Sequence, residues 1–284
     1  MITILFDGLA YGMLLFLISI GLAVTLGLMN FVNLAHGAFA MLGGYVCTLL
    51  LNRVGVPFLA TLPIAFVISA AVGVALERSL YRRLYSASHL DQVLFSIGLI
   101  FMAMASANYL LGAQQQPLDL PPMFKGQWHA FGADFGIYRV FLIAVGLVIA
   151  AALALLLAHT RFGAQIRAAV DNARAARGLG IDVERVFMVT FALGSGLAGL
   201  GGALGVELLG LDPGFPLKYL VYFLIVVAVG GSNTIIGPLA AALILGVADV
   251  AGKYYASQVG AFAIYAVMIA LLVLRPHGLF GRRA

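Results

Sequence analysis

Long apolar runs are the feature of this sequence that most limits its fold. Five of them, rich in Leu, Val, Ile, Ala and Phe, cover residues 4–28, 58–76, 92–111, 140–158 and 187–209. About 20 such residues cross the hydrocarbon core of a bilayer as a helix. Backbone N–H and C=O groups find no water there, so they must bond to each other within helices or closed barrels. Runs of this length predict an all-α, polytopic transmembrane helical bundle.

The composition excludes a soluble globular protein. Of 284 residues, 63% are hydrophobic and 10% are charged, whereas about a quarter of a soluble domain is charged. The single cysteine, Cys47, lies in an apolar segment, which excludes an intramolecular disulfide. We therefore treat residues 1–284 as one transmembrane domain.

Four further apolar runs are shorter or interrupted, and they cover residues 38–51, 219–229, 235–250 and 262–274. The first follows a polar break at residues 30–37, and the second ends at the sequence Gly-Gly-Ser-Asn, residues 230–233. Counting every run gives nine crossings, or eight if the break at residues 30–37 is re-entrant. Such broken segments are tolerated at membrane depth where they are buried in protein or line a cavity.

The basic residues indicate the orientation of the chain. They gather at residues 78–83, 161–185 and 275–283, and cytoplasmic loops carry an excess of Lys and Arg. Placing all three regions on the cytoplasmic side puts the C-terminus in the cytoplasm and the N-terminus in the periplasm. Residues 112–138 have few basic residues and become an extracytoplasmic loop. The net charge of +5 fits this loop bias rather than nucleic-acid binding.

Residues 160–181 form the one long polar segment. Apolar residues recur there at steps of three and four, which predicts one amphipathic helix with an arginine-rich face. Gly178 and Gly180 supply a stop signal. Two interpretations compete: a solvated loop whose arginines only fix topology, and a helix that docks in a groove of a soluble partner. The charge pattern alone leaves both interpretations open.

Two strings in the sequence resemble nucleotide-binding motifs but lack the features that such sites require. Residues 194–199 spell G-x-G-x-x-G, but inside an apolar span these glycines predict a helix-packing surface rather than a dinucleotide site. The segment 246–253 lacks the spacing and the Ser or Thr of a phosphate-binding loop. No catalytic or metal-ligand constellation is legible, so we expect a transport protein without a nucleotide site or cofactor of its own.

Polar residues within the apolar segments are candidates for a solute pathway. The break before residue 38 contains Asn33, His36 and Gly37, which either cap a helix end or expose backbone dipoles to a solute. Glu207 is an ionisable residue near the end of a span. Asp249 and Lys253 stand four apart and can pair on one helix face. The residues at positions 33, 37 and 40 are identical to those at 233, 237 and 240, which hints at paired broken segments in the two halves of the chain. Ser232 and Asn233 therefore join the candidates for the solute pathway.

Five strings in order give the chain a resemblance to the branched-chain amino-acid permease family of ABC importers. They begin with N-L-A-H-G-A-F-A-M-L-G-G-Y at residues 33–45 and R-A-A-V-D-N at residues 167–172. G-I-D-V-E-R-V at residues 180–186, V-G-G-S-N-T-I-I-G-P at 229–238 and R-P-H-G-L-F-G at 275–281 follow. Ala38 departs from the polar or acidic residue that members often carry, and Asn233 is a variation of the glycine-rich turn.

The resemblance implies a complex in a bacterial inner membrane. Its parts are a second homologous permease, two cytoplasmic ATPase subunits that bind the ATP, and a periplasmic solute-binding protein. The resemblance favours the docking helix, within an ATPase-coupling loop at residues 159–186. The coupling residues would be Arg161, Arg167, Asp171, Asn172, Arg174, Arg177 and Gly180, with Arg167 and Asp171 pairing within the helix or with the ATPase. Branched-chain amino acids or similar small polar solutes would be carried. The alternative is a self-contained secondary transporter or channel, which needs ion-coupling carboxylates or a filter within the membrane.

Overall fold

The structure is a computed structural model that describes residues 1–29, 31, 33–85, 87–130, 132–231, 234–276 and 278–280. It is all-α, as predicted, apart from one short hairpin. The helices are α1 (Ile2–Met29), α2 (His36–Leu49), α3 (Phe58–Ser79), α4 (His89–Leu111), α5 (Ile137–His159), α6 (Arg161–Asp171), α7 (Ala173–Gly178), α8 (Val183–Leu209), α9 (Phe215–Gly230), α10 (Ile236–Tyr255) and α11 (Ala263–Leu274). A π-helical turn, Leu50–Val54, extends α2, and short 3₁₀ turns cover Tyr81–Leu84, Pro122–Phe124 and Gly260–Phe262.

Seven of the described helices are long and apolar enough to cross a membrane: α1, α2 with its π turn, α3, α4, α5, α8 and α10. The shorter apolar helices α9 and α11 complete the nine apolar segments expected from the sequence. With its 16 residues, α9 is about 24 Å long, less than the hydrocarbon core of about 30 Å. The bundle is therefore polytopic, and two of its segments are short.

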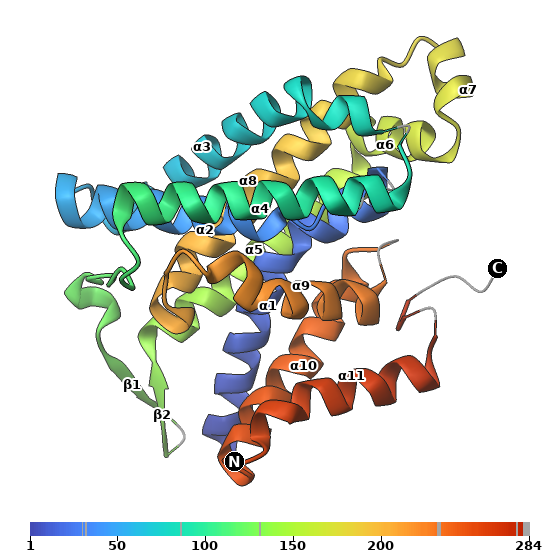
Figure 1. Ribbon diagram of the computed structural model, residues 1–284. Helices are drawn as coiled ribbons and strands as arrows, with labels where there is room; N and C mark the ends of the chain where they lie inside the picture. The colour runs from blue at the N-terminus through green and yellow to red at the C-terminus, as the bar shows by residue number, and fades with distance from the viewer. Residues whose placement is uncertain are drawn as a thin grey trace.

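The centre of the bundle is built by α1 and α8. Helix α1 packs against α8 and α10, and α8 packs against α2 and α3 (Figure 1). The most buried side chains of α1 lie in its middle, from Leu14 to Ile18. Helices α4 and α5 lie further out and expose many apolar side chains, as lipid-facing helices do.

Glycines allow the central helices to touch backbone to backbone. A Cβ added at Gly12 would overlap the backbone of α10 at Ala242, and one added at Gly43 would overlap Gly199 of α8. Gly202 approaches Ala40 of α2 in the same way. The packing surface predicted at residues 194–199 is thus confirmed as a close helix contact, and Gly8 and Gly12 form a second one against α10.

The predicted loop at residues 112–138 contains an antiparallel hairpin that the sequence did not suggest. Strands β1 (Gln127–Ala130) and β2 (Ala133–Gly136) pair with Gln127 opposite Gly136. Phe135 packs edge-on against Phe6 of α1, with ring centroids 4.7 Å apart, and Arg139 forms an ion pair with Asp7. The hairpin and the start of α1 therefore lie at the same end of the bundle.

The prediction of one amphipathic helix over residues 160–181 is wrong in one respect. The segment forms two helices, α6 and α7, because Asn172 is extended at φ −153° and ψ 95°. Its side-chain Oδ1 accepts a hydrogen bond of 3.0 Å from the N–H of Ala175 and so begins a new helix. An N-cap residue within the periodic pattern therefore ends one helix, begins the next and produces a bend between them.

Candidate functional site

Helices α6 and α7 stand at the end of the bundle opposite the hairpin, at the upper right of Figure 1. Their apolar side chains face inward in a small buried cluster, formed by Ile166, Ala169 and Ala176 with Val183 and Val186 of α8. Arg167 Nη1 donates a hydrogen bond to the carbonyl oxygen of Leu157 in α5. The segment is therefore fixed to both of the spans that it connects, so a push on it would be passed to α5 and α8.

The outward face of this segment joins positive charge with exposed apolar groups. Arg161, Arg174 and Arg177 are exposed, and none of them forms an ion pair with another described residue. Val170 is 41% exposed and Leu179 is 81% exposed. Unpaired arginines beside exposed apolar side chains are typical of a surface that is covered by a partner. We call this face, residues 161–180 of α6 and α7, the coupling surface, after the role that the resemblance predicts for it.

The remaining predicted coupling residues shape the coupling surface. Asn172 caps α7, and Gly180 adopts φ +82°, a left-handed conformation that favours glycine and closes the turn after α7. Asp171 is exposed. The expected pair between Arg167 and Asp171 is not formed among the described residues, because the Arg167 guanidinium bonds to the α5 carbonyl instead.

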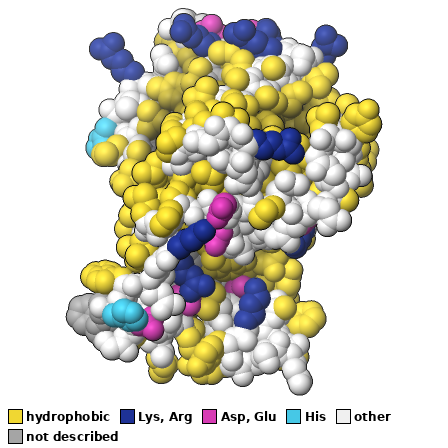
Figure 2. Space-filling model, turned by 90° about the vertical axis from the view of Figure 1, so that its left-hand side faces the viewer, with side chains coloured by type: hydrophobic (Ala, Val, Ile, Leu, Met, Phe, Trp, Pro, Cys, Tyr) yellow, Lys and Arg dark blue, Asp and Glu magenta, His cyan; other side chains and the backbone are white. Residues whose placement is uncertain are grey.

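A polar cavity beside the coupling surface was not predicted. It measures about 420 Å³ and lies between the end of α3, the turn Tyr81–Leu84 and the start of α8. Arg82 forms an ion pair across it with Glu184. From the sequence we predict only a topological role for Arg82, because no sequence pattern pairs two residues so far apart in the chain. Figure 2 shows Lys and Arg side chains gathered at the top of the molecule, above a broad hydrophobic area.

Asn33 and His36, in the polar break before α2, are buried and hydrogen-bonded. Asn33 Oδ1 accepts hydrogen bonds from the N–H of Ala35, at 3.1 Å, and from the hydroxyl of Tyr81, at 2.9 Å. His36 Nε2 lies 2.7 Å from the carbonyl oxygen of Ile18 in α1. These contacts are those expected of a break that satisfies free backbone groups in the absence of water. They favour the capping interpretation of Asn33 and His36.

Of the other pathway candidates, Gly37 lies beside this group and Glu207 does not. Gly37 packs against Pro216 and Phe223 of α9. Glu207 is exposed near the end of α8, where the charge of Lys125 from the hairpin loop acts on it. Ser232 and Asn233 lie outside the described residues. The structure therefore places Asn33, His36 and Gly37 together in the core and Glu207 elsewhere.

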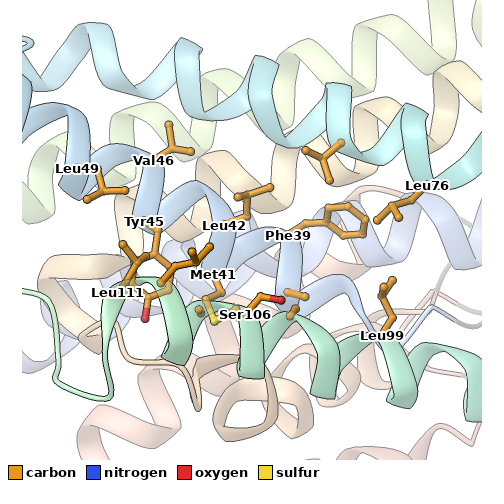
Figure 3. Close-up of a pocket in the computed structure, with 15 residues that line it drawn as sticks. Phe39, Met41, Leu42, Tyr45, Val46, Leu49, Leu76, Leu99, Ser106 and Leu111 are labelled. Carbon is orange, nitrogen blue, oxygen red and sulfur yellow. The ribbon is translucent and has the colours of Figure 1, made fainter.

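The segment that follows the break lines an apolar pocket of about 400 Å³ between α2, α3 and α4 (Figure 3). Phe39, Leu42 and Tyr45 of α2 face Leu76 of α3 and Leu99 of α4 across it. Nearly all of its lining is hydrocarbon, so it suits an apolar group. The charged ammonium and carboxylate of an amino acid would find no partners in it.

Among the described residues, no three His, Cys, Asp or Glu side chains lie close enough to hold a metal ion. The predicted pair on α10 is confirmed, with Lys253 Nζ 2.5 Å from Asp249 Oδ2. In the described part of the chain, the coupling surface is thus the arrangement best suited to binding a partner protein. The polar groups inside the bundle are the arrangement best suited to binding a solute.

Comparisons with known proteins show the family of the chain. The family model for the branched-chain amino acid transport system / permease component matches residues 4–274. The chain is 28% identical to the high-affinity branched-chain amino acid transport system permease protein LivH of Escherichia coli K12, over 98% of this chain and 94% of that protein. It is 30% identical to the probable permease LivH of Methanocaldococcus jannaschii, over 98% and 92% of the two chains.

A second kind of permease matches as well. The chain is 24% identical to LivM of Salmonella typhimurium, over 94% of this chain and 68% of that protein. No solved structure matches the chain significantly. Since the family match covers nearly the whole of a multi-pass helical bundle, the chain belongs to the family of permease components of branched-chain amino acid transport systems, which are permease subunits of ABC transporters.

Proposed function

We propose that this chain is the permease subunit of a bacterial ABC importer for branched-chain amino acids. The observation that carries the proposal is the coupling surface, an arginine-bearing face fixed by packing to two membrane spans. The sequence contains no phosphate-binding motif, so the ATP that drives transport is bound by another polypeptide. Two cytoplasmic ATPase subunits supply it, and each permease presents its α6–α7 segment to one of them.

Coupling follows from how the segment is held. An amphipathic helix pair lies in a groove of the ATPase, with the exposed Val170 and Leu179 buried there and Arg174 and Arg177 facing acidic groups on the rim. Arg161 and Asp171 face the same partner. When ATP binding closes the ATPases, the segment moves, and α5 and α8 move with it. The spans then rock around a pathway shared with a second, homologous permease.

This assignment also fixes the orientation in the inner membrane. The α6–α7 end carries the dense arginines and faces the cytoplasm. The hairpin and the start of α1, at the other end, face the periplasm, where a solute-binding protein delivers its cargo. The chain itself moves the solute and catalyses no reaction. The names of its relatives favour Leu, Ile and Val as solutes.

Purification of the tagged chain from native membranes in mild detergent tests this proposal. We expect a second permease and an ATPase to co-purify, and we expect ATP hydrolysis by the complex to rise when the binding protein is added with L-leucine. Complexes from a strain whose chain lacks residues 161–178 provide the control and should lose the ATPase. Recovery of the chain without any ATPase from wild-type membranes would contradict the proposal.

A further inference from the structure

A charged pair inside the bundle has no part in the coupling surface. Asp249 and Lys253 lie one turn apart on α10, with Nζ and Oδ2 separated by 2.5 Å. Asp249 is only 1% exposed, whereas the side chain of Lys253 is 50% exposed. The second oxygen of Asp249, Oδ1, is buried and has no hydrogen-bond partner among the described residues. A buried carboxylate oxygen without a partner is costly, and ionisable residues within a membrane are commonly functional.

The pair lies at the end of the bundle from which an imported solute would arrive. Helix α10 runs against α1, and Val247 meets Gly8. Asp7, next to Gly8, pairs with Arg139, which follows the hairpin. Asp249 is two residues beyond Val247 in the same helix. The charged pair is therefore near the hairpin end, opposite the coupling surface (Figure 1).

Tyr11 of α1 and Tyr222 of α9 lie near the pair, and Tyr219 of α9 and Tyr265 of α11 lie beside Tyr222. Lys253 Nζ lies 5.6 Å from the ring centroid of Tyr11. The ring centroids of Tyr219 and Tyr222 are 6.1 Å apart, and those of Tyr222 and Tyr265 are 6.3 Å apart. The charge of Asp249 acts on both Tyr11 and Tyr222. The cluster thus offers an anion, a cation and aromatic surface in one place.

We infer that this cluster is a binding subsite for the zwitterionic head of an aliphatic amino acid on its way through the permease. The α-ammonium donates to Asp249 Oδ1, the α-carboxylate accepts from Lys253, and the tyrosine rings contact the aliphatic side chain. The inference deepens the proposed function and rests on it.

The chemistry selects a zwitterion over other solutes. A cation would pair with Asp249 but would add a positive charge beside Lys253. An anion would pair with Lys253 but would add a negative charge beside Asp249. A zwitterion adds no net charge and supplies one partner for each member of the pair, which limits the cost of desolvation. The apolar pocket between α2, α3 and α4 offers neither partner.

Access to the subsite requires the surrounding helices to separate, because Asp249 Oδ1 is enclosed in this conformation. Helix α11 is the segment best placed to move. It has only 12 residues and packs chiefly against α9, α10 and the turn Gly260–Phe262. It carries Tyr265, so its displacement would uncover the aromatic side of the cluster.

The test uses the complete complex in proteoliposomes, with saturating binding protein and labelled L-leucine. In Asp249→Asn and in Lys253→Met, we expect uptake per ATP hydrolysed to fall about tenfold or more, as expected for loss of a hydrogen bond to a charged group. ATP hydrolysis stimulated by the binding protein should stay at the wild-type level. The matched controls Asp119→Asn and Lys125→Met alter an exposed pair, 2.7 Å apart in the hairpin loop, and should leave the ratio unchanged.

A purely structural ion pair would give other results. Uptake and ATP hydrolysis would then fall together with the yield of complex, or the double variant Asp249→Asn with Lys253→Met would restore uptake. Either result, or an unchanged ratio in both single variants, would overturn the subsite but leave the importer intact. A wild-type complex that fails to accumulate leucine would overturn both.

A second measurement covers the case in which the Asp249 variant does not assemble. Ala256→Cys in a Cys47→Ser background places one thiol at an exposed position three residues beyond Lys253 and leaves the pair intact. A water-soluble thiol reagent should label it from the hairpin side, and cycling with L-leucine and ATP should slow the labelling. Labelling that leucine does not slow would contradict the subsite.

Discussion

Reversing the charge of Arg174 and Arg177 to Glu should abolish ATP hydrolysis stimulated by the binding protein while leaving the chain in the membrane. Both side chains are exposed and unpaired among the described residues, so the fold loses nothing. At the interface, like charges would face each other at a cost of several kcal/mol, and each 1.4 kcal/mol or so weakens binding tenfold. We expect the ATPase to bind roughly 100-fold more weakly or worse. Stimulated ATP hydrolysis by the reconstituted complex, together with the amount of bound ATPase, measures this.

Two variants control for that experiment. Arg53→Glu makes the same charge reversal in an exposed turn between α2 and α3 and should have no effect on coupling. Arg174→Lys with Arg177→Lys keeps the charge and should retain most of the activity. Undiminished coupling in the Glu double variant would show that the arginines serve topology alone.

Adding one methyl group at Gly43 should strongly destabilise the bundle. Its Cβ would overlap the backbone of Gly199 where α2 crosses α8, so the two central helices must move apart. Overpacking of a rigid contact costs about 1–3 kcal/mol, and more when backbone is involved. We expect Gly43→Ala to lower the free energy of unfolding by about 3 kcal/mol, measured by denaturant unfolding of the purified chain in detergent.

Helix α4 offers a matched control. Gly98 is also within a spanning helix, but a Cβ added there would meet open space. Because Ala favours a helix over Gly by up to about 1 kcal/mol, Gly98→Ala should be neutral or slightly stabilising. Equal effects at the two glycines would mean that the close contact between α2 and α8 does not determine stability.

The parts of the fold that depend on local sequence could be predicted. Apolar length predicted the spans, and the glycines at residues 194–199 predicted the packing surface of α8 that meets α2. Helix ends were less accurate, because polar caps extend the helices beyond their apolar runs. Ser88 and Asp91 form a capping box that starts α4 at His89, and Asp182 caps α8 at Val183.

Features that depend on distant residues could not be predicted. The pair between Arg82 and Glu184 joins segments about a hundred positions apart, and no periodicity reports such contacts. The pair between Asp249 and Lys253 was visible from its spacing, but the tyrosines around it come from three other helices. The bend at Asn172 had a local signal, an N-cap residue, that was outweighed by the regular apolar pattern on either side.

The most direct test is solute accumulation by the purified chain with and without its ATPase. In liposomes containing the permeases alone, labelled L-leucine should never exceed its external concentration, whatever ion gradient is imposed. With the ATPase, the binding protein and ATP added, it should accumulate well above that concentration. Accumulation by the chain alone would contradict the account, because the coupling surface would then not be the point at which energy enters.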